Sequence, residues 1–160
     1  MFRKRYPLLT ISSEIELPYN YSLGKYGGRL VTELKHNSRI VGIKCPECGH
    51  VYVPPRRVCG KCFIEMDEFV EVSNSGILQS FTVVYFSFLD PETGKKRPVP
   101  YGYGRIKLDG ANSDFLCFLE ESDFEKLKIG VRVEAVYNEN RVGSFKDIKY
   151  FKKVEGSDPS

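Results

Sequence analysis

Four of the five cysteines lie close together in the chain, as two CxxC pairs that could jointly bind a metal ion. The segment reads CPECGHVYVPPRRVCGKC, and the pairs are Cys45 with Cys48 and Cys59 with Cys62. A CxxC turn followed by glycine, as at Cys48-Gly49, forms a knuckle whose backbone N–H groups can point at the sulfur atoms. Two knuckles supply a tetrahedral set of four thiolates, which suits zinc. We therefore expect one zinc ion held by these four cysteines.

A site of this composition is expected to be structural. Four protein ligands leave no coordination position for a substrate or an activated water. A ribbon this small has little core of its own, and bound zinc can supply an apparent ~10–16 kcal/mol toward folding. His50 follows the first pair but is not needed as a ligand. Iron in a rubredoxin-like site and a redox-active pair of dithiols stay open as alternatives.

No catalytic group is evident in the sequence. The fifth cysteine, Cys117, lies among apolar residues and is expected to be a buried core thiol. A catalytic cysteine would need a basic partner, and the two histidines, His36 and His50, are both distant in sequence. The chain has no GxSxG motif, no glycine-rich phosphate loop and no carboxylate pair in a distinctive context. We expect a protein that is not an enzyme by itself.

The elements before the cysteines are one helix and one strand. Residues 22–37 predict a helix, because Tyr26, Leu30 and Leu34 recur at spacings of four and would share a face. Residues 40–43 are short and β-branched, and predict a strand that runs into the first cysteine pair. The acidic residues 67–71 are interpreted as a hinge between this part and the rest of the chain.

Beyond the hinge, the pattern predicts five strands with a short helix between the third and the fourth. The helix is expected at 122–128, where Ser122 and Glu125 form a capping-box pattern and Gly130 ends it. This order is that of an OB-fold barrel, with another small barrel or sandwich as the alternative. The five predicted strands are 76–88, 100–108, 114–120, 129–138 and 144–154.

Charge and composition indicate an ordinary globular protein of the cytoplasm. The net charge is +3, and the positive excess lies in the first part of the chain, while residues 73–160 are balanced. No apolar run approaches the roughly 20 residues that span a bilayer. The apolar stretch after the basic N-terminus is too short for a signal peptide. Cytoplasmic thiols are normally reduced, which disfavours disulfides between the cysteines.

The cysteine segment, the glycine-containing helix before it, and the stretches GILQSFTVVY and PYGYGRIKLDG after it resemble the DUF35 family. The likeness covers roughly residues 20–154. It implies a mainly β protein with an N-terminal helix, in which a rubredoxin-like zinc ribbon is followed by a five-stranded OB-fold barrel. The expected division is an N-terminal helical segment at 1–39, the ribbon at 40–66, the barrel at 67–155 and a disordered tail at 156–160.

The family resemblance also implies a function. Members are associated with acyl-CoA and act as partners or scaffolds of thiolase-like enzymes, including acetoacetyl-CoA thiolase and HMG-CoA synthase of the mevalonate pathway. Other relatives are partners in lipid metabolism. The resemblance therefore implies a non-catalytic, zinc-binding accessory subunit that helps bind or channel acyl-CoA. The zinc ligands carry over as Cys45, Cys48, Cys59 and Cys62, whereas no CoA-binding signature carries over.

CoA needs cations for its phosphates and an apolar trough for its pantetheine arm, so basic and aromatic residues are the candidates. Ordinary solvation or core packing is the competing interpretation for each of them. The candidates are Arg56 and Arg57 in the cysteine segment, Lys95, Lys96 and Arg97 in a polar loop, and Tyr101 and Tyr103 on the second barrel strand.

The alternative function is binding of single-stranded nucleic acid. OB barrels bind single strands by stacking bases on aromatic side chains within a basic groove. Aromatic residues and the cluster at 95–97 would serve, but the balanced charge of the barrel half counts against a basic groove. The aromatic candidates are Tyr85, Phe86, Phe88, Tyr101 and Tyr103.

Overall fold

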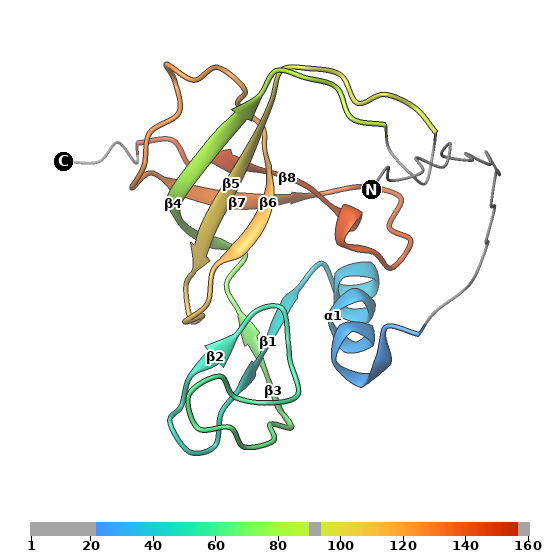
Figure 1. Ribbon diagram of the computed structural model, residues 1–160, viewed down its shortest axis with the longest axis vertical. Coiled ribbons are helices and arrows are strands. Elements are labelled where there is room, and N and C mark those ends of the chain that lie inside the picture. Colours follow the sequence, from blue (N-terminus) through green and yellow to red (C-terminus); the bar gives the residue numbers. More distant parts are fainter. Residues whose placement is uncertain (1–21, 90–93, 157–160) are drawn as a thin grey trace, which may run out of the picture.

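The computed structural model describes residues 22–89 and 94–156, which form one helix, a small sheet and a closed barrel (Figure 1). Residues 1–21 of the expected N-terminal segment lie outside the described residues, as does nearly all of the expected tail at 156–160. Within the part of the chain that is described, no helix is long and apolar enough to cross a lipid bilayer.

The helix α1 spans Gly24–Asn37 and precedes two β structures. The ribbon sheet has the strand order β2-β1-β3, with β1 at Ile40–Lys44, β2 at Val51–Tyr52 and β3 at Glu68–Val72. The barrel closes in the order β4-β5-β6-β8-β7. Its strands are β4 Ser75–Val84, β5 Tyr101–Leu108, β6 Phe115–Leu119, β7 Arg132–Tyr137 and β8 Ile148–Lys153, with a 3₁₀ turn at Phe145–Asp147 before β8.

The barrel has the strand arrangement predicted from the sequence. Neighbouring strands are antiparallel except β6 and β8, which pair in parallel where Leu119 faces Phe151. Five strands in this closed order make an OB-fold. The predicted fold class is thereby confirmed: mainly β, with an N-terminal helix, a zinc-ribbon region and then a five-stranded barrel.

The helix predicted at 122–128 does not form, and this prediction was wrong. Residues 124–126 make a single turn, in which the N–H groups of Lys126 and Leu127 donate to the carbonyl of Asp123. The carboxylate of Glu121 accepts from the N–H groups of Ser122 and Asp123, at 2.9 and 2.8 Å. Short polar and acidic side chains that bond to nearby N–H groups compete with a helix in this way.

The hinge predicted at 67–71 is also wrong, because residues 68–72 form strand β3 and pair with β1 along its full length. Glu68 and Glu71 are exposed, whereas Phe69 and Val70 are half-buried and Val72 is buried. The acidic residues therefore mark the solvent-facing side of a strand. The first barrel strand is shorter than predicted and ends at Val84.

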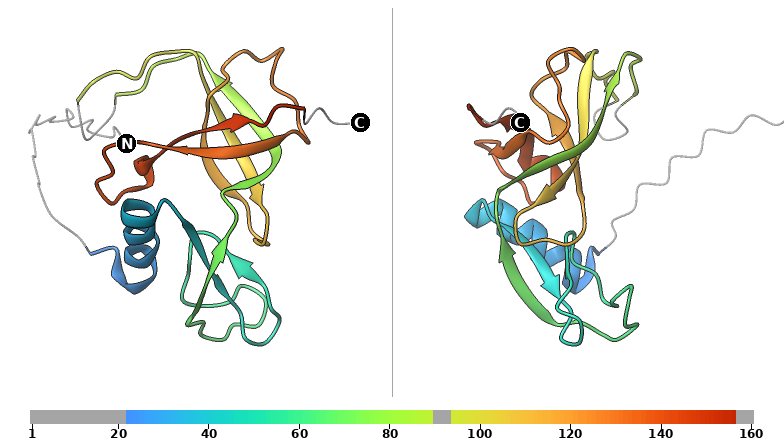
Figure 2. Two further views of the ribbon diagram at one scale, coloured as in Figure 1. Left: turned by 180° about the vertical axis from the view of Figure 1, so that it is seen from behind. Right: turned by 90° about the vertical axis from the view of Figure 1, so that its left-hand side faces the viewer.

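The ribbon and the barrel share one hydrophobic core. Val41, Val53 and Val72 of the ribbon region pack in the same cluster as the barrel interior, and a second, smaller cluster surrounds the cysteines. The loop after β5 reinforces the joint, since the Asn112 side chain accepts from the N–H of Val51 at 2.8 Å. The ribbon is thus fixed against the barrel, with α1 packed beside both (Figure 2).

A buried carboxylate joins α1 to the ribbon sheet. Leu30 and Leu34 of the helix are fully buried, and Glu33 between them is buried as well. Glu33 accepts from Asn37 at 2.7 Å and pairs with Arg29 at 3.0 Å and Arg39 at 2.9 Å. Its hydrogen bond with Asn37, and then the Arg39 guanidinium, lower the pKa of the Glu33 carboxyl. Because Arg39, in the segment between α1 and β1, also pairs with Glu71 of β3, the network ties α1 to β3.

We predict that Glu33→Gln lowers the free energy of unfolding at pH 7 by about 1–3 kcal/mol, the range for losing a charged partner in a buried network. A lowered pKa stabilises the folded state above the ordinary glutamate value of about 4.3. The difference in unfolding free energy between Glu33→Gln and wild type should therefore stay constant from pH 7 to pH 5. It should decline only as the pH falls below the ordinary glutamate pKa. Denaturant unfolding of the zinc-loaded protein measures it. Glu71→Gln, whose side chain is 58% exposed, is the control, with an expected loss below about 1 kcal/mol; equal losses would contradict the prediction.

Candidate metal centre

Two knuckles of the same design bring the cysteine pairs together. In the first, the N–H of Gly49 donates to the carbonyl of Cys45 at 2.9 Å. In the second, the N–H of Phe63 donates to the carbonyl of Cys59 at 3.1 Å. The first cysteine pair directly follows β1. This position brings the sulfur atoms of Cys45 and Cys48 close to those of the second knuckle. Local backbone hydrogen bonds thus set the position of each thiol, as the CxxC spacing predicts.

The four sulfur atoms lie within 4.8 Å of one another, and the Sγ atoms of Cys48 and Cys59 are 3.8 Å apart. Zinc–sulfur bonds of about 2.3 Å in a tetrahedron require sulfur separations of about 3.8 Å. Cys45 and Cys59 are buried, Cys62 is half-buried and Cys48 is exposed. All four are free thiols. The cluster therefore fits a single zinc ion bound by four thiolates, which matches the predicted cofactor.

Hydrogen bonds favour the thiolate form at one of these sulfurs. The Tyr52 hydroxyl lies 3.5 Å from the Cys59 sulfur, and the N–H groups of Lys61 and Cys62 donate to the same atom. The Tyr52 contact and then the backbone donors lower the pKa of Cys59 to about 5. Hydrogen bonding with the Cys48 thiol, together with burial, raises the pKa of Cys62 to about 12. Cys59 is thus readily deprotonated, whereas its neighbour Cys62 tends to stay protonated. A bound divalent cation stabilises the thiolate form of both.

Aromatic and basic residues surround the cluster. The Tyr52 hydroxyl also accepts from the N–H of Gly60 at 3.0 Å, and its ring contacts His50, with ring centres 4.5 Å apart. His50 is not one of the clustered ligands, in line with the expectation that it is not needed. Arg56 lies over the Tyr52 ring at 5.0 Å and donates to the Val58 carbonyl. Arg57 forms an ion pair with Glu65 at 3.0 Å.

Three of the other proposed ligand residues come together on the barrel. Arg97 stacks over the Phe118 ring at 4.0 Å and lies 5.5 Å from the centre of the Tyr101 ring. Tyr101 and Tyr103 both meet Phe118 edge-on, at 5.7 and 5.1 Å between ring centres. Lys95 and Lys96 precede Arg97 in the chain and are exposed. Sequence reasoning missed Phe118, because its role depends on how β5 pairs with β6.

A groove of about 330 Å³ lies beside this cluster, on the face formed by β5, β6 and β8. Its lining carries three cations and, among the described residues, no acidic side chain. Cys117 belongs to the lining but is buried, as predicted, and burial raises the pKa of its thiol to about 11. The lining residues are Arg97, Tyr103, Leu116, Cys117, Phe118, Asn138, Phe145, Lys146, Ile148 and Lys149.

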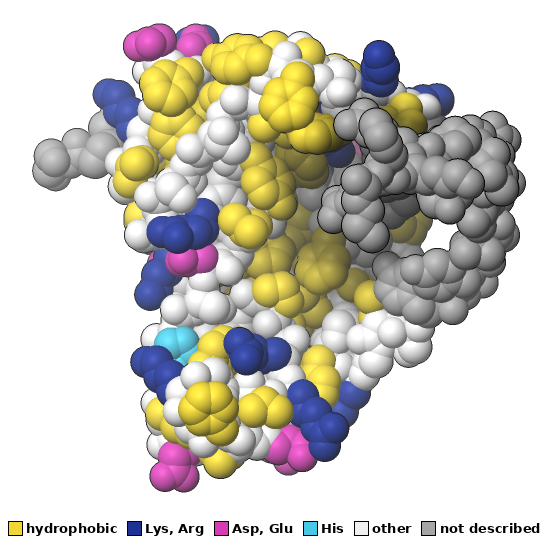
Figure 3. Space-filling view, viewed as in Figure 1, with side chains coloured by type: hydrophobic (Ala, Val, Ile, Leu, Met, Phe, Trp, Pro, Cys, Tyr) yellow, Lys and Arg dark blue, Asp and Glu magenta, His cyan; other side chains and the backbone are white. Residues whose placement is uncertain are grey.

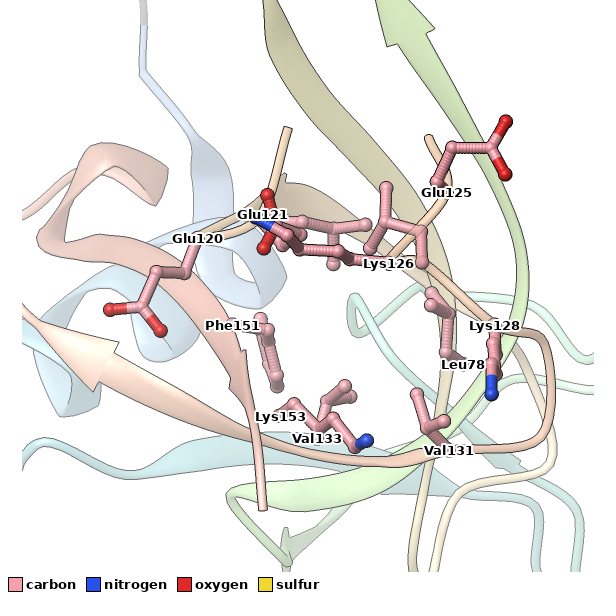
Figure 4. Close-up of a pocket in the computed structure, with 12 residues that line it drawn as sticks. Leu78, Glu120, Glu121, Glu125, Lys126, Lys128, Val131, Val133, Phe151 and Lys153 are labelled. Carbon is pink, nitrogen blue, oxygen red and sulfur yellow. The ribbon is translucent and has the colours of Figure 1, made fainter. Parts of the chain in front are cut away.

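A larger groove of about 630 Å³ opens at the end of the barrel where a helix was predicted (Figure 4). Leu78, Val133 and Phe151 face the hollow, while Glu120 and Glu125 point away from it. Three glutamates and three lysines share the lining, so its charges are mixed. Sequence reasoning missed this groove because it assigned the covering segment to a helix. The adjoining acidic residues Glu121 and Asp123 were the available signal.

We predict one zinc ion per chain in the purified protein and loss of most of it in Cys48→Ser. This cysteine is exposed, so the substitution removes a ligand while disturbing little packing. Because bound zinc can supply an apparent ~10–16 kcal/mol, the ribbon should unfold. Elemental analysis and circular dichroism measure the two effects. Cys117→Ser serves as the matched thiol control and keeps its zinc; a red, iron-containing wild type, or full zinc in Cys48→Ser, would contradict the assignment.

Comparison with known proteins identifies both parts of the chain. Residues 37–67 match the family model described as the ChsH2 rubredoxin-like zinc ribbon domain, and residues 69–138 match the ChsH2 C-terminal OB-fold domain. A DUF35 domain-containing scaffold protein from Methanocaldococcus jannaschii is 29% identical over 105 residues, which are 65% of this chain and 71% of that protein.

Two solved structures share the architecture. A DUF35-family protein of unknown function from Sulfolobus solfataricus is 25% identical, with a TM-score of 0.57 over 81% of this chain and 84% of that one. The structure described as an Ltp2-ChsH2(DUF35) aldolase is similar in fold, with 19% identity and a TM-score of 0.61 over 84% of this chain and 98% of that one. From the four-thiol ribbon, the barrel behind it and these matches, we conclude that the chain belongs to the DUF35 family.

Proposed function

We propose that this protein is a non-catalytic accessory subunit that docks onto a thiolase-like acyl-CoA enzyme in the cytoplasm. Two relatives support an accessory role. The Methanocaldococcus jannaschii protein is described as a scaffold protein, and the solved aldolase is described as containing Ltp2 together with ChsH2(DUF35). Acetoacetyl-CoA thiolase and HMG-CoA synthase are the partners that we propose. The closed zinc site supports this proposal, since four thiolate ligands leave zinc no open position for catalysis.

The observation that carries the proposal is an exposed aromatic arm. We use this name for five large side chains of the β4–β5 hairpin, which extends beyond the barrel (Figure 1). Their exposed fractions range from 41% to 68%. Consecutive exposed apolar residues are unusual in a monomer and mark surfaces that another molecule covers. The aromatic arm consists of Tyr85, Phe86, Phe88, Leu89 and Val99.

Hydrogen bonds hold the backbone of the aromatic arm in place although its side chains are exposed to solvent. The N–H of Arg97 donates to the carbonyl of Phe88 at 3.0 Å, and the Ser87 hydroxyl donates to the carbonyl of Arg97 at 2.6 Å. The rings of Phe86 and Phe88 lie 4.6 Å apart and contact each other. Hydrophobic side chains gather along the upper part of the barrel in the space-filling view (Figure 3). Burying such side chains is worth about 1.5–3 kcal/mol each, which is ample for a docking surface.

For acyl-CoA we propose the groove beside Arg97, Tyr101 and Tyr103. The groove offers cations without acidic side chains among the described residues that line it, and aromatic rings next to them. Phosphate groups favour arginine, and the pantetheine arm favours an apolar wall. Arg56 and Arg57 already contact Tyr52 and Glu65 within the ribbon. They are therefore weaker candidates than Arg97.

The same groove supports the alternative function, binding of single-stranded nucleic acid. OB-folds bind single strands through aromatic rings, on which bases stack, and nearby cations, which contact the phosphates. The binding face is usually formed by strands two and three of the barrel. Here those strands are β5 and β6, and both contribute to the groove. Binding to oligonucleotides should then weaken steeply with salt.

Replacing Phe86 and Phe88 together by serine should weaken binding to the thiolase-like enzyme of the same organism more than tenfold, because two anchoring rings are lost. Co-purification and titration of the two proteins test this. Zinc content and Tm should stay near wild type, since both side chains are exposed. Phe124→Ser, on the loop between β6 and β7 and 58% exposed, is the matched control. Recovery of no acyl-CoA enzyme with the wild type would contradict the proposed function.

Replacing Arg97 by alanine should weaken CoA binding to the assembled complex by about tenfold, as expected for losing one charged contact. The double substitution of Arg56 and Arg57 by alanine should leave it unchanged. Calorimetric titration of the complex with CoA measures both. Salt-sensitive binding of a single-stranded oligonucleotide by the wild type, without association with an acyl-CoA enzyme, would favour the alternative function.

A further inference from the structure

Phe63 occupies a backbone conformation that normally belongs to glycine. It ends the second zinc knuckle at φ 59°, and the matching position of the first knuckle is Gly49 at φ 69°. The two residues make the same hydrogen bond, from their N–H to the carbonyl of the first cysteine of their pair. Left-handed backbone costs a non-glycine residue about 1–2 kcal/mol. The second knuckle therefore carries a strain that the first avoids.

Among the described residues, the Phe63 side chain finds little packing that could offset this strain. It is 80% exposed, more than any other large hydrophobic side chain among the described residues. The next residue, Ile64, packs against the cysteine cluster, whereas Phe63 does not belong to that cluster. Val58, which bridges to Glu65 across the same knuckle, is 38% exposed. Strain and exposure at one aromatic residue point to a contact outside this chain.

The knuckle holds Phe63 rigidly. Its N–H donates to Cys59 at 3.1 Å, and Cys59 donates back from its own N–H to the Ile64 carbonyl at 2.9 Å. The residue before Phe63 is Cys62, one of the four clustered thiols. An aromatic side chain on a fixed backbone loses little entropy when it enters a pocket. These are the properties of an interface anchor.

The net charge of the ribbon indicates which class of partner it can bind. Four cations lie between residues 44 and 66, against two glutamates and the two net negative charges of a zinc ion bound by four thiolates. With zinc bound, residues 44–66 are therefore electrically balanced, and the neighbouring strand β3 adds exposed Glu68 and Glu71. This charge disfavours nucleic acid or an anionic membrane as the occupant. The cations are Lys44, Arg56, Arg57 and Lys61, and the glutamates are Glu47 and Glu65.

We propose that Phe63 is an anchor that the second zinc knuckle inserts into an apolar pocket of the partner enzyme. This inference rests on the proposed accessory function and adds a contact separate from the aromatic arm. The ribbon and the β4–β5 hairpin lie at opposite ends of the molecule (Figure 1). The partner enzyme is thus held at the ribbon by an apolar contact.

Phe63→Gly separates this role from a structural one. Glycine removes the ring and relieves the strain, so Tm of the zinc-loaded free protein should rise by about 2–4 °C, the shift for about 1 kcal/mol in a chain of this size. Binding to the thiolase-like enzyme should weaken more than tenfold, and the loss should change little between 50 and 300 mM salt. Phe63→Asn should also lose binding, with a smaller rise in Tm than Phe63→Gly, because asparagine tolerates the left-handed conformation better than phenylalanine. Phe63→Tyr should bind the enzyme nearly as well as wild type, because it keeps the aromatic ring.

Several outcomes would overturn the proposal. Undiminished binding by Phe63→Gly would show that the ring is not an anchor. A fall in Tm with zinc retained would show that the ring stabilises its own chain. A shift from dimer to monomer in sedimentation would assign the pocket to a second copy of this chain. Val142→Ala, at an exposed side chain of a barrel loop, is the control and binds like wild type. If the wild type binds no acyl-CoA enzyme, the proposed function fails and this inference with it; if only Phe63 proves dispensable, the proposed function stands.

Discussion

The convergence of four thiols within 4.8 Å is the constraint on which the first half of the fold depends. Among the described residues, the hydrophobic cluster at this site has five buried members, two of which are Cys45 and Cys59 themselves, and β2 is two residues long. So small a core cannot offset the entropy of ordering the two knuckles. Bonds to a metal ion can do so, because their free energy is available only when the ribbon is folded. The sulfurs thus replace the core that the ribbon lacks.

The same constraint reaches the barrel through shared strands and side chains. β1 leads into the first knuckle and pairs with β3, which continues into the first barrel strand after Ser73 and Asn74. Val53, next to β2, donates its N–H to Ser113 at 2.7 Å, and the Ser113 hydroxyl donates back at 2.9 Å. A ribbon ordered by metal therefore has a defined orientation on the barrel. This geometry is what an accessory subunit needs in order to present two surfaces at once.

The sequence was most informative where its signals were local. The CxxC spacing predicted the metal ligands, and the apolar pattern predicted the five strands of the barrel, because both depend on near neighbours. It failed at residues 122–128, where the carboxylates of Glu121 and Asp123 bond to the N–H groups of their own loop. The sequence was also misleading at β3, because the exposed glutamates of this strand form an acidic stretch that is typical of a hinge. The grooves and the Arg97–Phe118 stack could not be predicted, because strands distant in sequence build them.

Stability and binding impose opposite demands on this small protein, and the described surface reflects both. Apolar side chains that pack between the ribbon and the barrel contribute to folding, whereas the aromatic arm and Phe63 remain exposed. The latter raise the risk of aggregation without stabilising the free chain. They become favourable only when a partner covers them. The metal cluster fixes the backbone at Phe63, and none of the described barrel residues belongs to that cluster. Metal loss should therefore release the ribbon contact and leave the arm intact, so that the two ends of the molecule respond differently to zinc.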